Sequence, residues 1–268
     1  MRDVQNDLDK RGVNIQKVGI KDFDIPLNIR RKNSSNRTVN AKARVTVSLP
    51  ENYKGTHMSR FIEVLTDWQN KDVLGSDLKD CITQIADKLL AKDGELQLDF
   101  KYFINKTAPV SKLVSPLGYD CMFKSILLNR NTDNEKYKFI LGVKVPVTTL
   151  CPCSKEISDY GAHNQRAIVS VNICYDTSKH HIWIEDLIKE IENCASSSVY
   201  SLLKREDEKY VTEHAYKNPK FVEDVLRDIV TILRKNEVIT SFEVECNSME
   251  SIHNHSAWAY QKEIKEIK

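Results

Sequence analysis

Apolar and polar residues alternate in four short segments of the chain. In residues 41–49 every odd-numbered position is apolar and every even-numbered position is polar, and this period of two is typical of a strand with one buried face. The same alternation recurs in residues 96–102, 169–175 and 242–246. These segments therefore predict half-buried strands of an antiparallel sheet.

A second pattern, with a period near 3.6 residues, predicts helices. Apolar side chains follow this period at residues 61–68, at residues 187–195 and most strongly at residues 221–233, where Pro219 stands just before the repeat. The predicted order is a pair of strands, a helical stretch over about 57–90, strands over about 95–145, a cysteine-rich loop, one more strand, helices over about 183–235 and a closing strand.

Strand pairs followed by helix pairs, twice over, predict an α+β chain of two similar halves. We place the halves at about 15–115 and 116–250, each with helices on one face of an antiparallel sheet. The proline-bearing stretch TAPVSKLVSPLGYD, residues 107–120, is the best candidate for the joint between them.

Composition excludes several classes of protein. The 268 residues carry 40 basic and 38 acidic side chains, interspersed along the chain, unlike the one-sided basic stripe of a nucleic-acid binder. The N-terminal stretch is polar, and no segment approaches the roughly 20 apolar residues that span a bilayer. We therefore expect a cytoplasmic protein that binds neither membranes nor nucleic acids. The odd number of cysteines, 7, favours reduced thiols.

The string CPCSKEISDYGAHNQR concentrates the candidate chemistry. Cys151 and Cys153 are one residue apart, a spacing that does not favour a disulfide or the usual redox motif. Pro152 stiffens the loop, and Gly161 allows the chain to turn back so that a thiolate and the imidazole of His163 could meet at one cation. These residues supply two or three ligands, whereas a structural zinc site needs four.

The remaining ligand candidates lie far along the chain. The segment KREDEKYVTEH contains Glu206, Glu208 and Glu213, but carboxylates in such a charged run usually form a solvated helix face. The stronger candidates follow in MESIHNHSAWAY, where His253 and His255 stand close to Glu250. A His-x-His pair on a strand would place both imidazoles on one face, and histidine is a natural ligand or proton carrier near neutral pH.

Four long strings carry a family resemblance over almost the whole chain. They are KGTHMSRFIEVL (54–65), CPCSKEISDYGAHNQRA (151–167), KREDEKYVTEHAYKNPKFVEDVLRD (204–228) and ESIHNHSAWAY (250–260). With the N-terminal VQNDLDKRGVNIQKVGIKDFDIPL, they resemble the type B family of GTP cyclohydrolase I. The resemblance implies the tunnelling fold, in which two ββαα halves form a subunit. It also implies a homotetramer whose active sites lie between subunits.

The resemblance also implies a metal site and a reaction. Cys151, His163 and Glu208 match the family's metal ligands, with Cys153 as an alternate, so the resemblance reverses the solvated-face interpretation of Glu208. One divalent metal per subunit is expected, and this donor set accepts zinc, manganese or iron. The implied activity converts GTP and water to 7,8-dihydroneopterin triphosphate and formate, the first step of folate and pterin biosynthesis.

Substrate and proton-transfer roles follow from the same resemblance. Glu223, in the string PKFVEDVLRD, matches the carboxylate that anchors the guanine ring. A carboxylate suits this role because its two oxygens can accept in parallel from the ring N1–H and the 2-amino group. Phe221 and Val222 beside it are expected to be core residues. His253 and His255 match the residues that deliver and remove protons, with Glu250 orienting a histidine.

The triphosphate needs a basic pocket, and no P-loop occurs in the sequence. Arg60 is the main candidate, with His57 and Ser59 at the start of the same predicted helix. Arg166 and Lys209 are weaker candidates, and an arginine in an amphipathic helix usually faces water.

Two other functions remain open on the sequence. One is a nitrile reductase of queuosine synthesis on the same fold, with a cysteine nucleophile and a nicotinamide cofactor, which NADPH absorbance during turnover would reveal. The other is a non-catalytic binding module held by zinc through Cys151, Cys153, His163 and one more ligand. Chelation should unfold such a module, whereas a catalytic site should lose activity and keep its helix signal.

Overall fold

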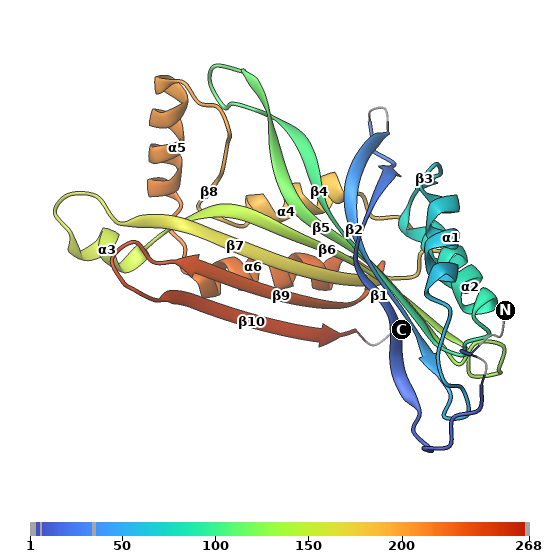
Figure 1. Ribbon diagram of the computed structural model, residues 1–268. Coiled ribbons are helices and arrows are strands. Elements are labelled where there is room, and N and C mark those ends of the chain that lie inside the picture. The colour runs from blue at the N-terminus through green and yellow to red at the C-terminus, as the bar shows by residue number, and fades with distance from the viewer. Residues whose placement is uncertain (1–3, 6, 34–35, 266–268) are drawn as a thin grey trace. The chain divides into compact units, whose positions relative to one another are not determined.

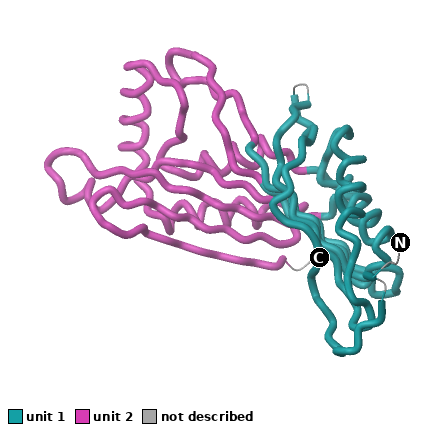
Figure 2. The backbone as a smooth tube through the Cα atoms, viewed as in Figure 1, with its two compact units in different colours: residues 1–101, 122–141, 176–181 teal, residues 102–121, 142–175, 182–268 magenta. Residues whose placement is uncertain are grey.

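The computed structural model describes residues 4–5, 7–33 and 36–265. The chain folds into two compact units that share three long strands (Figure 2). Unit 1 comprises residues 1–101, 122–141 and 176–181, and unit 2 comprises residues 102–121, 142–175 and 182–268.

Unit 1 combines a sheet with two amphipathic helices (Figure 1). The alternation in residues 41–47 buries Ala41, Ala43, Val45 and Val47, since one face of a strand turns inward at every second residue. The helices contribute fully buried side chains such as Phe61. The elements in chain order are β1 (Ile15–Ile29), β2 (Arg37–Leu49), α1 (Met58–Trp68), β3 (Asp72–Val73), the short 3-10 helix η1 (Gly75–Asp77) and α2 (Leu78–Lys88).

Three strands pass from one unit to the other, and unit 2 adds the rest. The shared strands are β4 (Gly94–Thr107), β5 (Val114–Leu128) and β6 (Lys136–Leu150). Unit 2 then contains α3 (Pro152–Ile157), β7 (Asn164–Tyr175), α4 (Ile184–Asn193), β8 (Ser197–Ser198), α5 (Arg205–Lys217), α6 (Val222–Lys235), β9 (Ile239–Met249) and β10 (Ser256–Ile264). Each helix in the described part of the chain is too short or too polar to span a bilayer.

The strand order places particular strand ends side by side. In unit 1 the hydrogen-bonded order is β6-β5-β4-β2-β1-β3, and in unit 2 it is β10-β9-β7-β6-β5-β4, with β8 beside β6. Ala167 at the start of β7 pairs with Ser248 at the end of β9, and Met249 pairs with Ser256 at the start of β10. The start of β7, the end of β9 and the start of β10 therefore lie together, and the site is built there.

The α+β class with antiparallel pairing is confirmed, and each predicted strand and helix has its counterpart. The pattern did not predict α3, inside the cysteine-rich loop, or β10, which adds a second strand at the end of the chain. Residues 107–120 form the connection between β4 and β5 and the first part of β5. The two units are interleaved along the chain, and the duplication of two similar halves stays a prediction.

Candidate active site

A pocket of about 260 Å³ lies in unit 2 where the strand ends meet. It is lined from six segments: the end of β6, the cysteine-rich loop, the start of β7, the turn between β9 and β10, the start of β10 and the N-terminus of α6. Its volume is close to the lower limit of small-molecule sites, roughly 300–1,000 Å³. The lining residues are Thr149, Cys151, His163, Gln165, Lys220, Phe221, Val222, Glu223, Glu250, His253, His255 and Ala257.

The cysteine-rich loop closes on itself and brings a thiol and an imidazole to this pocket. Cys151 caps the N-terminus of α3, where its Sγ accepts a hydrogen bond from the backbone N–H of Ser154 at 3.4 Å. The backbone N–H of Cys151 donates to the carbonyl of His163 at 3.1 Å. Gly161 has a φ of 76°, a conformation that favours glycine. The predicted return of the chain at Gly161 is confirmed.

Cys151 is the partly exposed thiol of the pocket, while several other thiols are held protonated by burial. All seven cysteines are free. Burial raises the pKa of Cys81 to about 12. It raises the pKa of Cys194 to about 11, with Asp228 adding to the effect. Burial also raises the pKa of Cys246 to about 12. Since the thiolate is the nucleophile and metal ligand, these three are structural residues.

Polar side chains that point inward near the ends of β6, β7 and β9 form a hydrogen-bond network at the pocket. The Gln165 amide nitrogen lies 3.2 Å from Thr149 Oγ1 and 3.3 Å from Glu250 Oε1. The Gln165 oxygen lies 2.9 Å from His163 Nδ1. Thr149 Oγ1 is also 3.1 Å from the buried hydroxyl of Ser248. The hydrogen bonds join three strands and the loop that carries His163 into one network.

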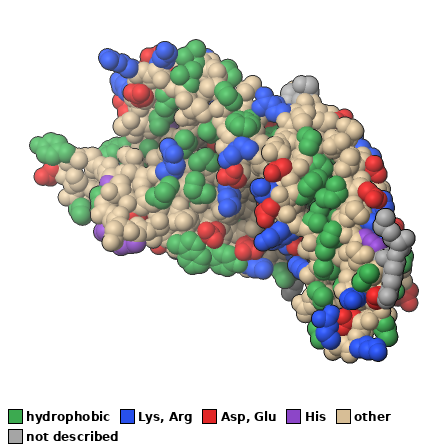
Figure 3. Space-filling model, in the orientation of Figure 1, with side chains coloured by type: hydrophobic (Ala, Val, Ile, Leu, Met, Phe, Trp, Pro, Cys, Tyr) green, Lys and Arg blue, Asp and Glu red, His purple; other side chains and the backbone are tan. Residues whose placement is uncertain are grey.

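Two more imidazoles lie in the turn between β9 and β10. The rings of His253 and His255 are stacked, with centroids 5.0 Å apart and planes inclined by 13°. Both residues are exposed, and histidine side chains are visible at the surface near this turn in Figure 3. The pair does not lie on a strand, because β9 ends at Met249 and β10 begins at Ser256. The turn itself brings the rings together.

The N-terminus of α6 supplies a carboxylate and an aromatic ring to the pocket. Glu223 lies in the first helical turn and is exposed, so its oxygens are available to a ligand. Phe221 precedes the helix, and its backbone N–H donates to Asp224 Oδ2 at 3.0 Å. Val222 is a core residue as predicted, with 6% exposure, but Phe221 is 38% exposed and lines the pocket. The core prediction for Phe221 is wrong, because its ring belongs to the wall of the pocket.

The donor types fit a divalent cation, although the side chains are not gathered around one point. Thiol, imidazole and carboxylate are the ligands that zinc and related metals take from proteins. Cys151, His163 and Glu250 place all three donor types on one pocket. The part of the chain that the structure describes contains no group of three or more His, Cys, Asp or Glu side chains arranged to hold a metal.

A family model described as type I GTP cyclohydrolase folE2 matches residues 1–259. The chain belongs to this family. Curated relatives named GTP cyclohydrolase FolE2 include those of Citrifermentans bemidjiense, 48% identical over 97% of this chain and 93% of the relative, and Geotalea uraniireducens, 49% identical over 97% and 92%. The relative from Dictyoglomus turgidum is 48% identical over 97% and 96% of the two chains. The family resemblance of the sequence motifs is confirmed.

Solved structures confirm the tunnelling fold. The uricase of Arthrobacter globiformis matches with a TM-score of 0.57 at 6% identity and covers 94% of each chain. The urate oxidase of Bacillus subtilis matches with a TM-score of 0.55 at 9% identity, over 94% of this chain and 100% of that one. At such low identity the likeness concerns the fold of this FolE2-family chain and not its chemistry.

Two of the four expected metal ligands of the FolE2-family chain lie outside the pocket. Cys151 and His163 line it, whereas Cys153 is exposed on α3 and Glu208 is exposed in the first turn of α5. The neighbouring carboxylate, Asp207, is the buried one of that run.

The phosphate candidates of the FolE2-family chain lie mainly in unit 1. His57 and Arg60 line a small pocket of about 50 Å³ at the start of α1, where the Arg60 guanidinium donates to the carbonyl of Lys88 at 3.1 Å. Ser59 is exposed on the same helix. Arg166 and Lys209, the weaker candidates, are exposed in β7 and α5. None of these side chains lines the pocket of unit 2.

Sequence reasoning missed Gln165 and Thr149, although a signal for both exists. Each occupies an inward position that continues a row of buried apolar residues, with Val145 and Val147 before Thr149 and Ala167 after Gln165. A polar residue at such a position needs a hydrogen-bond partner. Such a polar residue therefore indicates where the apolar core ends and a functional site begins.

Proposed function

We propose that the protein is a metal-dependent GTP cyclohydrolase that converts GTP and water to 7,8-dihydroneopterin triphosphate and formate, the first step of folate biosynthesis. The observation that carries this proposal is the pocket of unit 2, which combines the Cys151 thiol, three imidazoles and two carboxylates in a chain of the FolE2 family. The relatives bear the name of this activity.

Guanine recognition is assigned to the N-terminus of α6. The carboxylate of Glu223 can accept two parallel hydrogen bonds, from the ring N1–H and from the 2-amino group. The partly exposed ring of Phe221 lines the same pocket and offers a flat surface against which a purine can stack. Together they would place the imidazole half of guanine toward the thiol and the histidines.

Cys151 and His163 are the residues that would hold the cation, because they supply a thiolate and an imidazole to one pocket. A bound divalent cation lowers the pKa of a coordinated water toward neutrality. Glu208 and Cys153 stay proposed ligands on the family resemblance alone. The physiological metal, zinc, manganese or iron, is not distinguished by these donors.

His253 and His255 are assigned the proton transfers at the purine. Water attacks C8 more readily once N7 is protonated, and histidine is the side chain best suited to deliver and remove protons near neutral pH. The stacked rings lie in the turn that lines the pocket. The second hydrolysis, which releases C8 as formate, needs further proton transfers, so two imidazoles in one place are useful.

The triphosphate subsite and the assembly are proposed together. Arg60, with His57 and Ser59, is the proposed phosphate-binding group, and the expected homotetramer would build active sites between subunits. Light scattering on the purified protein tests the tetramer. An Arg60→Ala variant should raise the KM for GTP more than it lowers kcat, since a phosphate contact made equally in ground and transition states contributes uniform binding.

Incubation of metal-loaded protein with GTP tests the activity. Formate and a pterin that becomes fluorescent on oxidation should appear in equal amounts, and neither should form with ATP or with metal-stripped protein. Restoring the metal should restore both products. NADPH consumption with a nitrile substrate, and no formate from GTP, would contradict the proposal and favour the reductase.

A further inference from the structure

The amide of Gln165 has four polar neighbours, and they determine which way it points. Its Nε2 faces Glu250 Oε1 at 3.3 Å and Thr149 Oγ1 at 3.2 Å, while its Oε1 faces His163 Nδ1 at 2.9 Å and Ser251 Oγ at 3.5 Å. An ionised carboxylate only accepts hydrogen bonds. Rotating the amide by half a turn would place its oxygen against the carboxylate of Glu250, so the charge of Glu250 selects the orientation in which Nε2 donates.

This orientation has a consequence for His163. A neutral imidazole carries one proton, on either Nδ1 or Nε2, and the oxygen of Gln165 can only accept. The 2.9 Å contact is therefore a hydrogen bond only when His163 carries its proton on Nδ1. Nε2 then keeps its lone pair, which is the form that a metal ligand or a proton acceptor needs.

Glu250 does not replace Gln165 in this role. The nearest approach between Glu250 Oε2 and His163 Nδ1 is 4.0 Å, beyond hydrogen-bond distance. Thr149 is 1% exposed and Ser248 is fully buried, and their hydroxyls lie 3.1 Å apart. Because Thr149 accepts from Gln165, its hydroxyl can donate to Ser248 Oγ, so Thr149 is fixed between two hydrogen bonds at the end of β6.

We propose that Gln165 is a positioning residue of the site: its amide, oriented by Glu250 and Thr149, holds His163 in the Nδ1–H tautomer and leaves Nε2 free to bind the cation. The binding of the cation rests on the proposed function. The tautomer of His163 does not, because it follows from the hydrogen bonds of Gln165.

Solid-state ¹⁵N NMR of metal-free, histidine-labelled protein tests the tautomer directly. The spectra are recorded at about pH 8.5, above the range of roughly pH 5 to 8 in which imidazoles ordinarily change charge, and the ¹⁵N shifts distinguish the two neutral tautomers from the imidazolium. The His163 signals are identified by their loss in a His163→Asn variant. The parent protein should show His163 protonated at Nδ1. Gln165→Met keeps the length of the side chain but removes both polar groups, and it should shift His163 toward the Nε2–H form that predominates in free histidine.

Gln165→Glu serves as the conservative variant. A carboxylate at this position can still accept from His163 Nδ1–H, and two carboxylates in contact share one proton, so the parent tautomer should return even though the amide donor to Glu250 and Thr149 is lost. Gln97→Met, in β4 of unit 1, is the control for removing a hydrogen-bonded glutamine elsewhere, and it should leave the His163 signals unchanged. If Gln165→Met does not fold, the parent and Gln165→Glu spectra still decide the tautomer.

Cobalt binding tests the link to the cation without using activity. Titration of the metal-free protein with Co²⁺, followed by the thiolate-to-cobalt absorption band, should show affinity about 10- to 100-fold weaker in Gln165→Met, the usual loss for a group that orients a ligand. Gln165→Glu should recover most of this affinity, and Gln97→Met should match the parent.

The outcomes separate this inference from the proposed function. His163 protonated at Nε2 in the parent, or unchanged in Gln165→Met, overturns the role of Gln165 even if the parent converts GTP. An Nδ1–H tautomer that depends on Gln165, in a protein that releases no formate from GTP, supports the positioning role and contradicts the function. Equal cobalt affinities in the parent and Gln165→Met overturn the link to the cation.

Discussion

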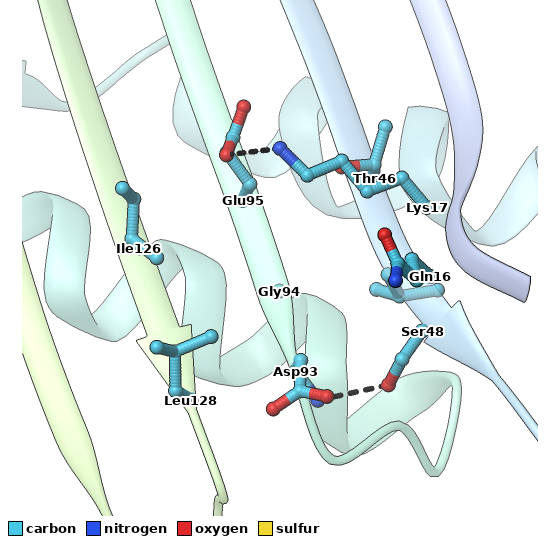
Figure 4. Close-up of a pocket in the computed structure, with 10 residues that line it drawn as sticks. Gln16, Lys17, Thr46, Ser48, Asp93, Gly94, Glu95, Ile126 and Leu128 are labelled. Atoms are coloured by element: carbon cyan, nitrogen blue, oxygen red, sulfur yellow. Dashed lines mark hydrogen bonds and ion pairs between the residues drawn. The ribbon is translucent and has the colours of Figure 1, made fainter.

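Two pockets of nearly equal volume differ in what their side chains can do. The pocket of unit 1, about 250 Å³, is lined by side chains of the neighbouring strands β1, β2, β4 and β5 and by Asp93, and it has Glu95 in its wall (Figure 4). Glu95 is only 8% exposed, and it accepts from Lys17 Nζ at 2.7 Å and lies 3.1 Å from Lys124 Nζ. The pocket of unit 2, about 260 Å³, is lined instead by a thiol, three imidazoles and two carboxylates.

The two pockets differ in whether their charged side chains are paired with each other or face the cavity. Burial alone would raise the pKa of Glu95, but the hydrogen bonds and charges of Lys17 and Lys124 lower it, so the carboxylate is already committed to its neighbours. In unit 2, Glu223 and the ring of Phe221 face the pocket. The two pockets have similar volumes, but the side chains of one form a structural ion-pair cluster and those of the other form a candidate active site.

The largest expected effect comes from removing the thiol or the imidazole of the unit 2 pocket. Cys151→Ala and His163→Ala should each abolish formate release from GTP, a loss greater than the roughly 100-fold typical of a residue that only orients a ligand. Bound metal should fall in parallel, while the circular-dichroism spectrum stays that of the parent. Metal analysis and the formate assay check both statements.

Cys153→Ala is the matched control for that experiment. It removes an exposed thiol two residues away that does not line the pocket, so the loss of activity should be milder. Full activity in metal-loaded Cys151→Ala would remove the distinction between the two thiols, and with it the assignment of the site.

The next largest effect concerns Glu223 and separates recognition from metal chemistry. Glu223→Gln keeps the size of the side chain but replaces one carboxylate oxygen with an amide N–H₂. That amide group would then face an N–H donor of guanine. The loss of a charge-assisted hydrogen bond, about 1.5–3 kcal/mol, should lower kcat/KM for GTP by roughly 10- to 150-fold. ITP, which lacks the 2-amino group, should be a poor substrate of the parent and lose less in the variant. Steady-state kinetics with both nucleotides measures this.

Metal content should be unchanged in Glu223→Gln. Glu237→Gln, an exposed residue just beyond α6, should have the activity of the parent. A variant at Glu223 that loses its metal, or that penalises ITP as strongly as GTP, would show that guanine is recognised elsewhere.

A smaller effect, on stability, is expected at Asp207 in unit 2. Burial would raise the pKa of this carboxyl, but hydrogen bonds from the Ser111 hydroxyl and from the backbone N–H groups of Lys204, Ser111 and Val110 hold it well below its ordinary value of 3.8. Asp207→Asn leaves an amide N–H₂ facing donors, so the melting temperature should fall.

The pH dependence at Asp207 follows from the direction of the shift. A pKa that is lower in the folded state contributes stability above the unfolded value, and this contribution is lost as the pH falls through the folded value. The difference in melting temperature between parent and Asp207→Asn should therefore be largest at neutral pH and shrink below about pH 4. A difference that grows on acidification would contradict the assignment.

The smallest effect is expected at the ion pairs of the unit 1 pocket. Glu95→Gln should lower the free energy of unfolding by about 1 kcal/mol, because Lys17 is half exposed and water screens the pair. Salt near 0.5 M should reduce this loss, while the loss in Asp207→Asn, which comes from uncharged donors, should persist. Urea unfolding at two salt concentrations measures both, and GTP turnover by Glu95→Gln should equal that of the parent.

The pattern of residues was enough to predict the half-buried strands, the main helices and the family. A strand that buries one face must alternate, and a helix that buries one stripe must repeat near 3.6 residues, so residues 41–49 and 221–233 could be assigned without coordinates. The strings around Cys151 and Glu223 identified the family, because long motifs that occur in a fixed order along the chain are specific to one family. β10 escaped prediction because no residue in it is fully buried, and α3, with six residues, is too short to show a period.

The assembly of the site, in contrast, depends on contacts between residues far apart in the chain. Thr149 and Ser248 are 99 positions apart in the chain, and Gln165 and Glu250 are 85 apart, yet each pair is in hydrogen-bond contact. Local patterns specify which face of a strand is inward, but not which strand ends become neighbours. The pairing register of β7 with β9 makes that choice, because shifting it by one residue would turn these side chains to the opposite face.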